Sequence, residues 1–182
     1  MTRIFIFVGM LMAWTTSVGG AMEKEDVRLF HDSVRLGDIV TVRTMVTEEP
    51  LLATSVDEYR FQPVHLLDMY FEPEILDLLL AHGADINARN DEGVTLLHLV
   101  AEPGAVSVLV GKGADLEAVD VRGWTPLLMQ ANEQRNDVVM QLLHVGADPN
   151  ASGGSGETAL SFAEISRNDE LISMLRAAGA RK

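Results

Sequence analysis

The sequence predicts an all-α solenoid in which helix–turn–helix units stack side by side and are joined by short β-turn fingers. The first observation is a Gly-Ala-Asp triplet at 83–85, 113–115 and 146–148, and Gly179-Ala180 continues the series. These marks lie 30, 33 and 33 residues apart. A period of roughly 20–50 residues is the signature of stacked repeats, because a single unit cannot bury its own apolar face.

A second motif recurs in register with the first. Each triplet is followed after about ten residues by a turn glycine and then by Thr, in the segments Gly93-Val94-Thr95, Gly123-Trp124-Thr125 and Gly156-Glu157-Thr158. Because both motifs keep the same register, the repeating element is a whole structural unit.

The third observation is that the residues between these marks suit helices. Pro63 and Pro126 stand where a helix begins, because the first helical turn does not need the N–H that proline lacks. Ile75, Leu76 and 78–80 form an apolar face that is too wide for an isolated helix, so neighbouring units must cover it. The glycines of the triplets then end the second helices, since glycine adopts a left-handed conformation without a steric penalty.

The segments after the turn glycines share a specific pattern. Thr125-Pro126-Leu127 keeps most of a Thr-Pro-Leu-His motif, Thr95-Leu96-Leu97-His98 lacks only the proline, and Gln62-Pro63-Val64-His65 keeps the proline and the histidine. Together with the closing Gly-Ala-Asp, this pattern resembles the ankyrin repeat. The resemblance implies that the rings of His65 and His98 bond to the neighbouring backbone across units.

The resemblance covers nearly all of the chain from residue 22 onward and divides it into units. We expect a degenerate N-terminal capping repeat at 22–56, ankyrin repeats at 57–89, 90–119 and 120–152, and a C-terminal capping repeat at 153–182. The unit from Asn90 is three residues short, and Glu102-Pro103-Gly104 falls where its two helices are joined. We therefore expect a clipped or tilted helix pair there. Terminal units of solenoids are atypical, because one of their faces meets water.

Residues 1–21 have the pattern of a secretory signal peptide. Arg3 precedes an apolar run at 4–14, and Gly19-Gly20-Ala21 offers small residues for cleavage. The alternative, a transmembrane anchor, needs roughly 20 apolar residues, and the run is interrupted from Thr15 onward. We expect a periplasmic protein, with the extracellular space as an alternative, and no membrane insertion after cleavage. The sequence has no Cys, which excludes disulfides and a lipid-modified Cys.

The charge of the chain limits its partners. The formal net charge is −13 at pH 7. This charge argues against nucleic acids, whose phosphates are bound by Lys and Arg, and against anionic lipid surfaces. A protein partner with a basic surface is favoured. The alternative is that the acidic charge only keeps the protein soluble. We expect the protein to be a monomer when it is free.

No pattern of catalysis or metal binding is found. The histidines at the repeated Thr-Pro-Leu-His position are explained by the repeat itself. Asp85-Ile86-Asn87 begins like a calcium loop, but Arg89 and Asn90 stand where a further ligand and a glycine belong. The stretch at 153–156 lacks the spacing of a nucleophile elbow. We therefore expect no cofactor, no metal and no enzymatic activity.

The resemblance also implies where a partner binds, because exposed turn residues and first helices line one concave face in the ankyrin family. The matching positions are Glu58, Tyr59, Phe61, Met69, Tyr70, Asp91, Glu92, Val94, Glu102, Val121, Arg122, Trp124, Asn132 and Glu133. Phe61, Val94 and Trp124 occupy the same place in successive units, which predicts an exposed apolar row of interface anchors. The alternative is that Phe61 or Trp124 folds back onto the neighbouring turn. The acidic members suit a partner that carries Lys or Arg.

The function that the resemblance implies is protein binding without catalysis. Exported bacterial proteins that are similar to this chain include immunity proteins that neutralise secreted toxins, and accessory proteins that support a periplasmic enzyme such as catalase. A small rigid acidic protein with one dense anchor row suits a dedicated partner, which favours the immunity role. A scaffold that holds several envelope proteins through weak contacts is a further alternative.

Overall fold

The computed structural model describes residues 23–181 of the chain, so the predicted signal peptide at 1–21 lies outside the described residues. The elements are α1 (Lys24–Arg35), α2 (Ile39–Glu48), η1 (Pro50–Thr54), η2 (Pro63–Leu67), α3 (Pro73–Ala81), α4 (Leu96–Leu99), α5 (Pro103–Gly111), α6 (Pro126–Asn132), α7 (Asn136–His144), α8 (Ala159–Ser166) and α9 (Asp169–Ala177). Residues 23–181 contain no strand, and one isolated antiparallel bridge joins Ser152 to Thr158. The predicted all-α class is confirmed. None of the helices in this range is long and apolar enough to span a membrane.

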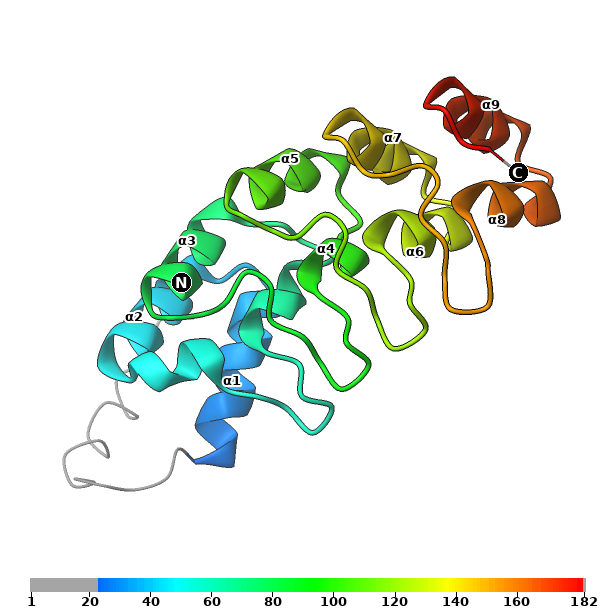
Figure 1. Cartoon of the computed structure of the whole chain (residues 1–182). Coiled ribbons are helices and arrows are strands. Elements are labelled where there is room, and N and C mark those ends of the chain that lie inside the picture. Colours follow the sequence, from blue (N-terminus) through cyan, green and yellow to red (C-terminus); the bar gives the residue numbers. More distant parts are fainter. Residues whose placement is uncertain (1–22, 182) are drawn as a thin grey trace, which may run out of the picture.

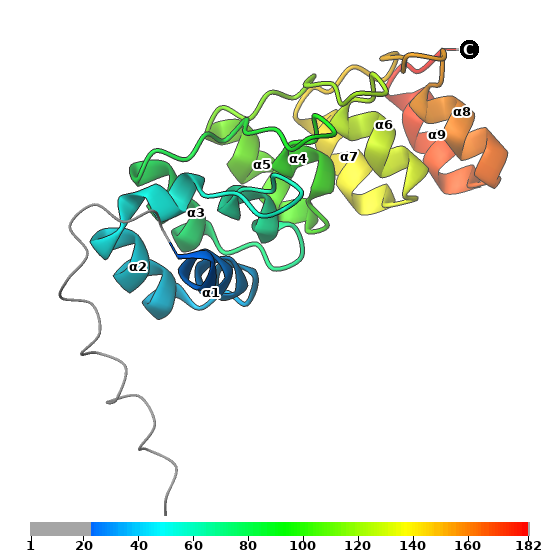
Figure 2. The same ribbon diagram turned by 90° about the horizontal axis from the view of Figure 1, so that it is seen from below.

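The helices lie in two rows, with the first helix of each unit in one row and the second helix in the other (Figure 1). The first row consists of α1, η2, α4, α6 and α8, and the second row consists of α2, α3, α5, α7 and α9. Within the first row, α4 packs on η2 and α6, and α6 packs on α8. The loops between units run along one edge of the molecule (Figure 2).

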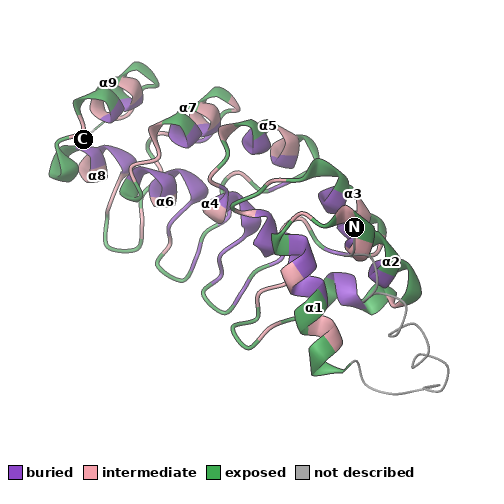
Figure 3. Cartoon of the chain, turned by 180° about the vertical axis from the view of Figure 1, so that it is seen from behind, coloured by how far each residue is buried: buried purple, intermediate pink, exposed green. Residues whose placement is uncertain are grey.

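One hydrophobic core runs the length of the stack, from Phe30 in α1 to Leu175 in α9. Figure 3 shows buried residues along both rows of helices. The core includes the fully buried Leu76 of α3 and Leu142 of α7, which belong to different units. Each unit therefore depends on its neighbours to bury its apolar face, as in other solenoids.

The predicted helix boundaries are found in the structure. Pro63 and Pro126 are the first residues of η2 and α6. Gly83 and Gly146 have φ angles of 91° and 104°, so the glycines that follow α3 and α7 are left-handed as predicted. These two signals position the ends of both helices in a unit.

The first helices of the two middle units are clipped. η2 is a 3-10 helix of five residues and α4 has four residues, whereas α6 has seven. The sequence predicted this for the unit from Asn90 but not for the unit before it. The second helices of these two units, α3 and α5, begin with proline, at Pro73 and Pro103. Steric contact with a proline ring favours extended backbone for the residue before it. Glu72 and Glu102 accordingly have ψ angles of 103° and 117°, and the chain leaves the helical conformation before them.

Candidate protein-binding surface

The loops between units form fingers that are closed by the same hydrogen bonds. They are finger 1 (57–61), finger 2 (90–94), finger 3 (120–124) and finger 4 (153–157), and in each the first N–H donates to the fifth carbonyl oxygen over 2.8–3.1 Å. In fingers 1 to 3 the first residue is Asp or Asn, and its Oδ1 accepts the N–H groups of the third and fifth residues. The side chain therefore fixes the backbone of each of these fingers before any partner arrives.

Fingers 2, 3 and 4 are tied to one another through their backbones. The Val121 N–H donates to the Glu92 carbonyl oxygen over 2.9 Å. The Gly154 N–H donates to the Arg122 carbonyl oxygen over 2.8 Å. These bonds hold three neighbouring fingers side by side.

Fingers 1 and 2 are parted instead. In the described part of the chain, no backbone hydrogen bond joins them, and their tips are linked by an exposed ion pair of 3.3 Å between Arg60 and Asp91. A hollow of about 160 Å³ lies between Tyr59 and Phe61 on one side and residues 90–92 on the other.

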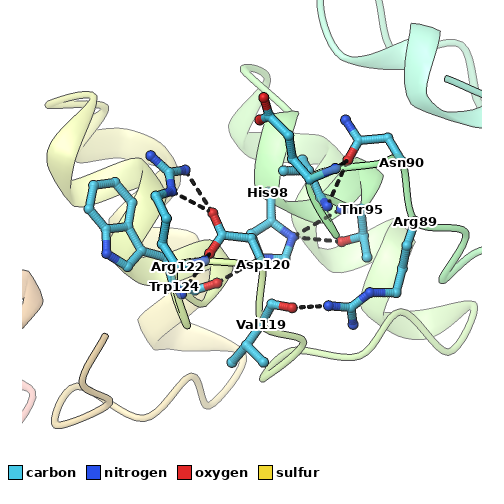
Figure 4. A network of polar contacts seen from close by, with 10 residues as sticks. Arg89, Asn90, Thr95, His98, Val119, Asp120, Arg122 and Trp124 are labelled. Carbon is cyan, nitrogen blue, oxygen red and sulfur yellow. Dashed lines mark hydrogen bonds and ion pairs between the residues drawn. The ribbon is translucent and has the colours of Figure 1, made fainter. Parts of the chain in front are cut away.

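Buried histidines seat the fingers on the first row of helices, as the resemblance implied. The Thr95 N–H donates to Nδ1 of His98 over 3.2 Å, so the ring proton sits on Nε2, which donates to the Trp124 carbonyl oxygen over 3.0 Å (Figure 4). His65 reaches the Val94 carbonyl oxygen over 3.2 Å in the same way. Burial lowers the pKa of both histidines, and the structural role predicted for them is confirmed.

Asp120 holds finger 3 together from inside. Its carboxylate accepts hydrogen bonds from the Trp124 and Arg122 backbone and from the Arg122 guanidinium (Figure 4). Burial opposes ionisation of Asp120, but these hydrogen bonds outweigh it and lower the pKa of the carboxyl group. At the base of the same finger, Arg89 donates to the Val119 carbonyl oxygen. Finger 3 is therefore held by hydrogen bonds both within the finger and at its base.

The apolar row predicted from Phe61, Val94 and Trp124 is not an exposed surface. Val94 is 3% exposed and Trp124 is 9% exposed, so the prediction that they are open anchors is wrong. Phe61 is half-buried and packs against the core. The reason is that the fifth finger residue packs on its surroundings: the Trp124 ring meets Phe162 of the next unit edge-on at 4.9 Å, and the Arg122 guanidinium lies 3.9 Å from its centroid.

The other predicted residues are exposed, but they lie on two edges of the molecule. The finger edge carries Glu58, Tyr59, Asp91, Glu92, Val121 and Arg122, and the turn edge, where first helices pass into second helices, carries Met69, Tyr70, Glu102, Asn132 and Glu133. Between the two edges lies a first helix such as α6, which is about 10 Å long given the helical rise per residue. The structure therefore does not bring these residues together in one groove.

A second hollow, of about 340 Å³, lies on the turn edge. It is lined by Leu36 and Gly37 of the α1–α2 turn, by Met69, Tyr70, Phe71 and Glu72 of the η2–α3 loop, and by Glu102. Met69 and Tyr70 were among the predicted binding residues, whereas Leu36 and Phe71 were not. The signal that could have found Phe71 is Pro73, which ends the helical stretch and opens the loop.

The acidic residues of the triplets have local roles. Oδ1 of Asp85 accepts the Asn87 N–H over 2.8 Å, and Asp115 and Asp148 make the same contact two residues ahead. Within residues 23–181, no group of three or more His, Asp or Glu side chains is arranged to hold a metal ion. The triplet carboxylates thus cap the loops that lead to the fingers.

Comparison with known proteins agrees with this architecture. Residues 64–153 match the family model of ankyrin repeats, in three copies. No curated protein matches the chain at a significant level. Ankyrin repeats are in general protein–protein interaction modules. The match, the two helix rows and the repeated fingers show together that residues 64–153 form ankyrin repeats.

Proposed function

We propose that the protein is exported to the periplasm and binds one dedicated protein partner there through its finger edge, without catalysing a reaction. The proposed partner is a secreted toxin, which the protein inhibits as an immunity protein. The observation that carries the proposal is the parting of fingers 1 and 2. The hollow between these two fingers is a recess in the finger row, whereas backbone hydrogen bonds hold fingers 2, 3 and 4 against one another.

The recess has the features of an anchor site. Tyr59, on one wall, is 64% exposed, and the carboxylates of Asp91 and Glu92 lie on the other. Tyrosine is enriched among residues that dominate binding energy at interfaces. Because Asp57 and Asn90 already fix both backbones, a partner would order only side chains, which lowers the entropic cost of binding.

The charge of the fingers favours a basic partner. Fingers 1 to 4 contain six carboxylates, Asp57, Glu58, Asp91, Glu92, Asp120 and Glu157, and two arginines, Arg60 and Arg122. Both arginines are paired with finger carboxylates. Lys and Arg side chains on a partner would therefore meet an acidic surface, which speeds association and disfavours acidic competitors.

Export is supported by the sequence of the first residues. The pattern at 1–21 suits a cleaved signal peptide, and α1 begins at Lys24. Cleavage after Ala21 would leave every described helix intact. Fractionation of cells that produce the full chain, with the mass of the protein measured in each fraction, tests this step. A protein that retains residues 1–21 in the cytoplasmic fraction would contradict it.

Capture of the partner tests the binding proposal. The tagged protein is compared with the double variant Tyr59→Ala/Glu92→Ala and with the control variant Leu51→Ala/Glu48→Ala. Leu51 is 64% exposed, as Tyr59 is, and lies in η1, away from the fingers. We expect one partner in a stoichiometric complex with the wild type and the control, and binding weaker by about ten-fold or more with the finger variant.

The identity of the captured protein then separates the functions. A secreted toxin whose activity is blocked at a one-to-one ratio supports the immunity role. A catalase or another periplasmic enzyme would replace this role with an accessory one. Several weakly bound envelope proteins would favour a scaffold. A partner that binds the finger variant as well as the wild type would contradict the assignment of the finger edge.

A further inference from the structure

The turn-edge hollow lies away from the fingers, at the other end of the first helices, and has exposed apolar side chains at its rim. Leu36 is 78% exposed, Tyr70 is 69% exposed and Met69 is 61% exposed, and all three line it. A soluble chain seldom leaves several large apolar side chains together in water unless something covers them. The rim therefore has the composition of a binding site.

Hydrogen bonds hold the loops around this hollow in place. The Ala101 N–H donates to the Asp68 carbonyl oxygen over 3.0 Å, which ties the η2–α3 loop to the α4–α5 loop. The buried side chain of Gln130 donates to the carbonyl oxygens of His98 and Val100, over 2.7 and 3.1 Å. The Gln130 bonds provide donors for carbonyl oxygens that lack a partner within the short helix α4. The loops around the hollow are therefore held in place before a partner binds.

The charged residues of the hollow are acidic. Glu72 and Glu102 line it, and its lining contains no Lys or Arg. The nearest arginine in sequence, Arg35, precedes Leu36 and is paired with Asp32 at 3.3 Å. With a net charge of −13 on the whole chain, a second copy of the protein would meet electrostatic repulsion here. A basic occupant would not.

From these observations we infer that the turn-edge hollow binds a basic amphipathic segment of a partner protein. A large apolar side chain of that segment enters between Leu36 and Tyr70, and flanking Lys or Arg side chains meet Glu72 and Glu102. The site is separate from the finger edge, so it gives the protein a second binding surface. Both surfaces can then be occupied at once, because the first helices lie between them.

A peptide selection tests this inference without knowledge of the partner. The protein, purified from cells that produce the full chain, is used to select from a displayed library of random peptides. Selected peptides are synthesised and their affinities measured against the turn-edge variants Leu36→Ser/Tyr70→Ser and Glu72→Gln/Glu102→Gln. Matched controls are Tyr59→Ser/Val121→Ser on the finger edge and the exposed pair Glu25→Gln/Glu48→Gln.

We expect peptides in which Lys or Arg flank Leu, Phe or Trp. Their affinity should fall by about ten-fold or more in both turn-edge variants and by less than about two-fold in both controls. An unchanged thermal unfolding midpoint would show that the variants are folded. Failure to select any peptide, a consensus without basic residues, or equal loss in the controls would overturn the inference. So would self-association of the wild type that is lost in the Leu36→Ser/Tyr70→Ser variant, because a second copy would then fill the hollow.

Discussion

The two middle units, 57–119, and the two C-terminal units, 120–181, share one repeat but differ in how the first helix passes into the second. In the middle units, loops at 68–72 and 100–102 make this connection. In the C-terminal units a single residue in left-handed conformation turns the chain, Gln134 with φ 60° or Arg167 with φ 55°. A proline at the start of the second helix distinguishes the middle units from the C-terminal ones.

Both hollows are lined by residues between 36 and 102, and neither includes a residue of the C-terminal units. In those units the turns are closed by side chains: Asn168 donates to Gln134 and to Asn136, over 2.9 Å in each case. The units with clipped first helices therefore border both hollows, whereas side-chain hydrogen bonds close the turns of the C-terminal units.

The largest effect on stability is expected at Gln130, where α6 of a C-terminal unit donates hydrogen bonds to the end of α4 in a middle unit. Gln130→Leu removes both hydrogen bonds to the end of α4 and leaves the His98 and Val100 carbonyl oxygens without these donors. We expect the free energy of unfolding in urea to fall by about 2–3 kcal/mol. The control is Gln141→Leu on α7, whose side chain makes no hydrogen bond within residues 23–181, and it should change stability by less than about 0.5 kcal/mol. Equal values for the two variants would show that α4 needs no support.

Acid should weaken the middle units more than the C-terminal ones. Burial lowers the pKa of His65 and His98, whereas Leu128 and Ser161 occupy the same position in the later units. Below about pH 6.5 these histidines become protonated in the unfolded chain but stay neutral in the folded chain, because their pKa is lower there. Their contribution to the free energy of unfolding is therefore fully present above this pH and is lost as the pH falls towards the folded pKa. Each histidine contributes at most about 1.4 kcal/mol per pH unit in that range. His31, whose pKa burial also lowers, adds to this effect.

Urea unfolding at pH 7 and pH 5.5 measures this dependence. The variant His98→Leu copies the residue of the next unit and should lose less stability between the two pH values than the wild type does. Hydrogen exchange at pH 5.5 should show faster opening in 57–119 than in 120–181. A pH dependence that His98→Leu leaves unchanged would assign the effect to other groups.

A smaller effect concerns the backbone of finger 1. Arg60 has a φ angle of 59° at the place where the other fingers have glycine, at 93, 123 and 156. Arg60→Gly and Arg60→Ala both remove the exposed ion pair with Asp91, but only glycine relieves the left-handed strain. We expect the glycine variant to be about 1 kcal/mol more stable than the alanine variant in urea unfolding. A more stable alanine variant would mean that finger 1 carries no strain.

The smallest effect should come from the exposed rim of the turn-edge hollow. Leu36→Ser and Tyr70→Ser should each change the free energy of unfolding by less than about 0.5 kcal/mol, because both side chains lie mostly in water. Thermal unfolding measures this. A loss comparable to that of Gln130→Leu would show that these residues belong to the core, and the hollow would then have a structural role.

Much of the fold could be predicted from the sequence because its signals are local. Pro63 and Pro126 specify where helices begin, and glycine at 83 and 146 specifies where they end, whatever surrounds them. The role of the repeated histidines was equally accessible, since two units show the same residue at the same place.

The candidate site was harder to predict because it depends on how units meet. Val94 and Trp124 stand at turn positions, but only the neighbouring unit decides that their side chains are covered. In the sequence Gln130 is only one polar residue in a predicted helix, and its role becomes clear only in the structure, where α4 is four residues long. Leu36 and Tyr70 are far apart in the chain and share a hollow through packing alone.

Hydrogen exchange of the protein with and without its captured partner tests whether the parted fingers 1 and 2 form the binding surface. We expect the partner to slow exchange in fingers 1 and 2, at 57–61 and 90–94, and to leave exchange in α7 and α9 unchanged. Slower exchange confined to the C-terminal units, with fingers 1 and 2 unaffected, would contradict the claim that the parted fingers form the binding surface.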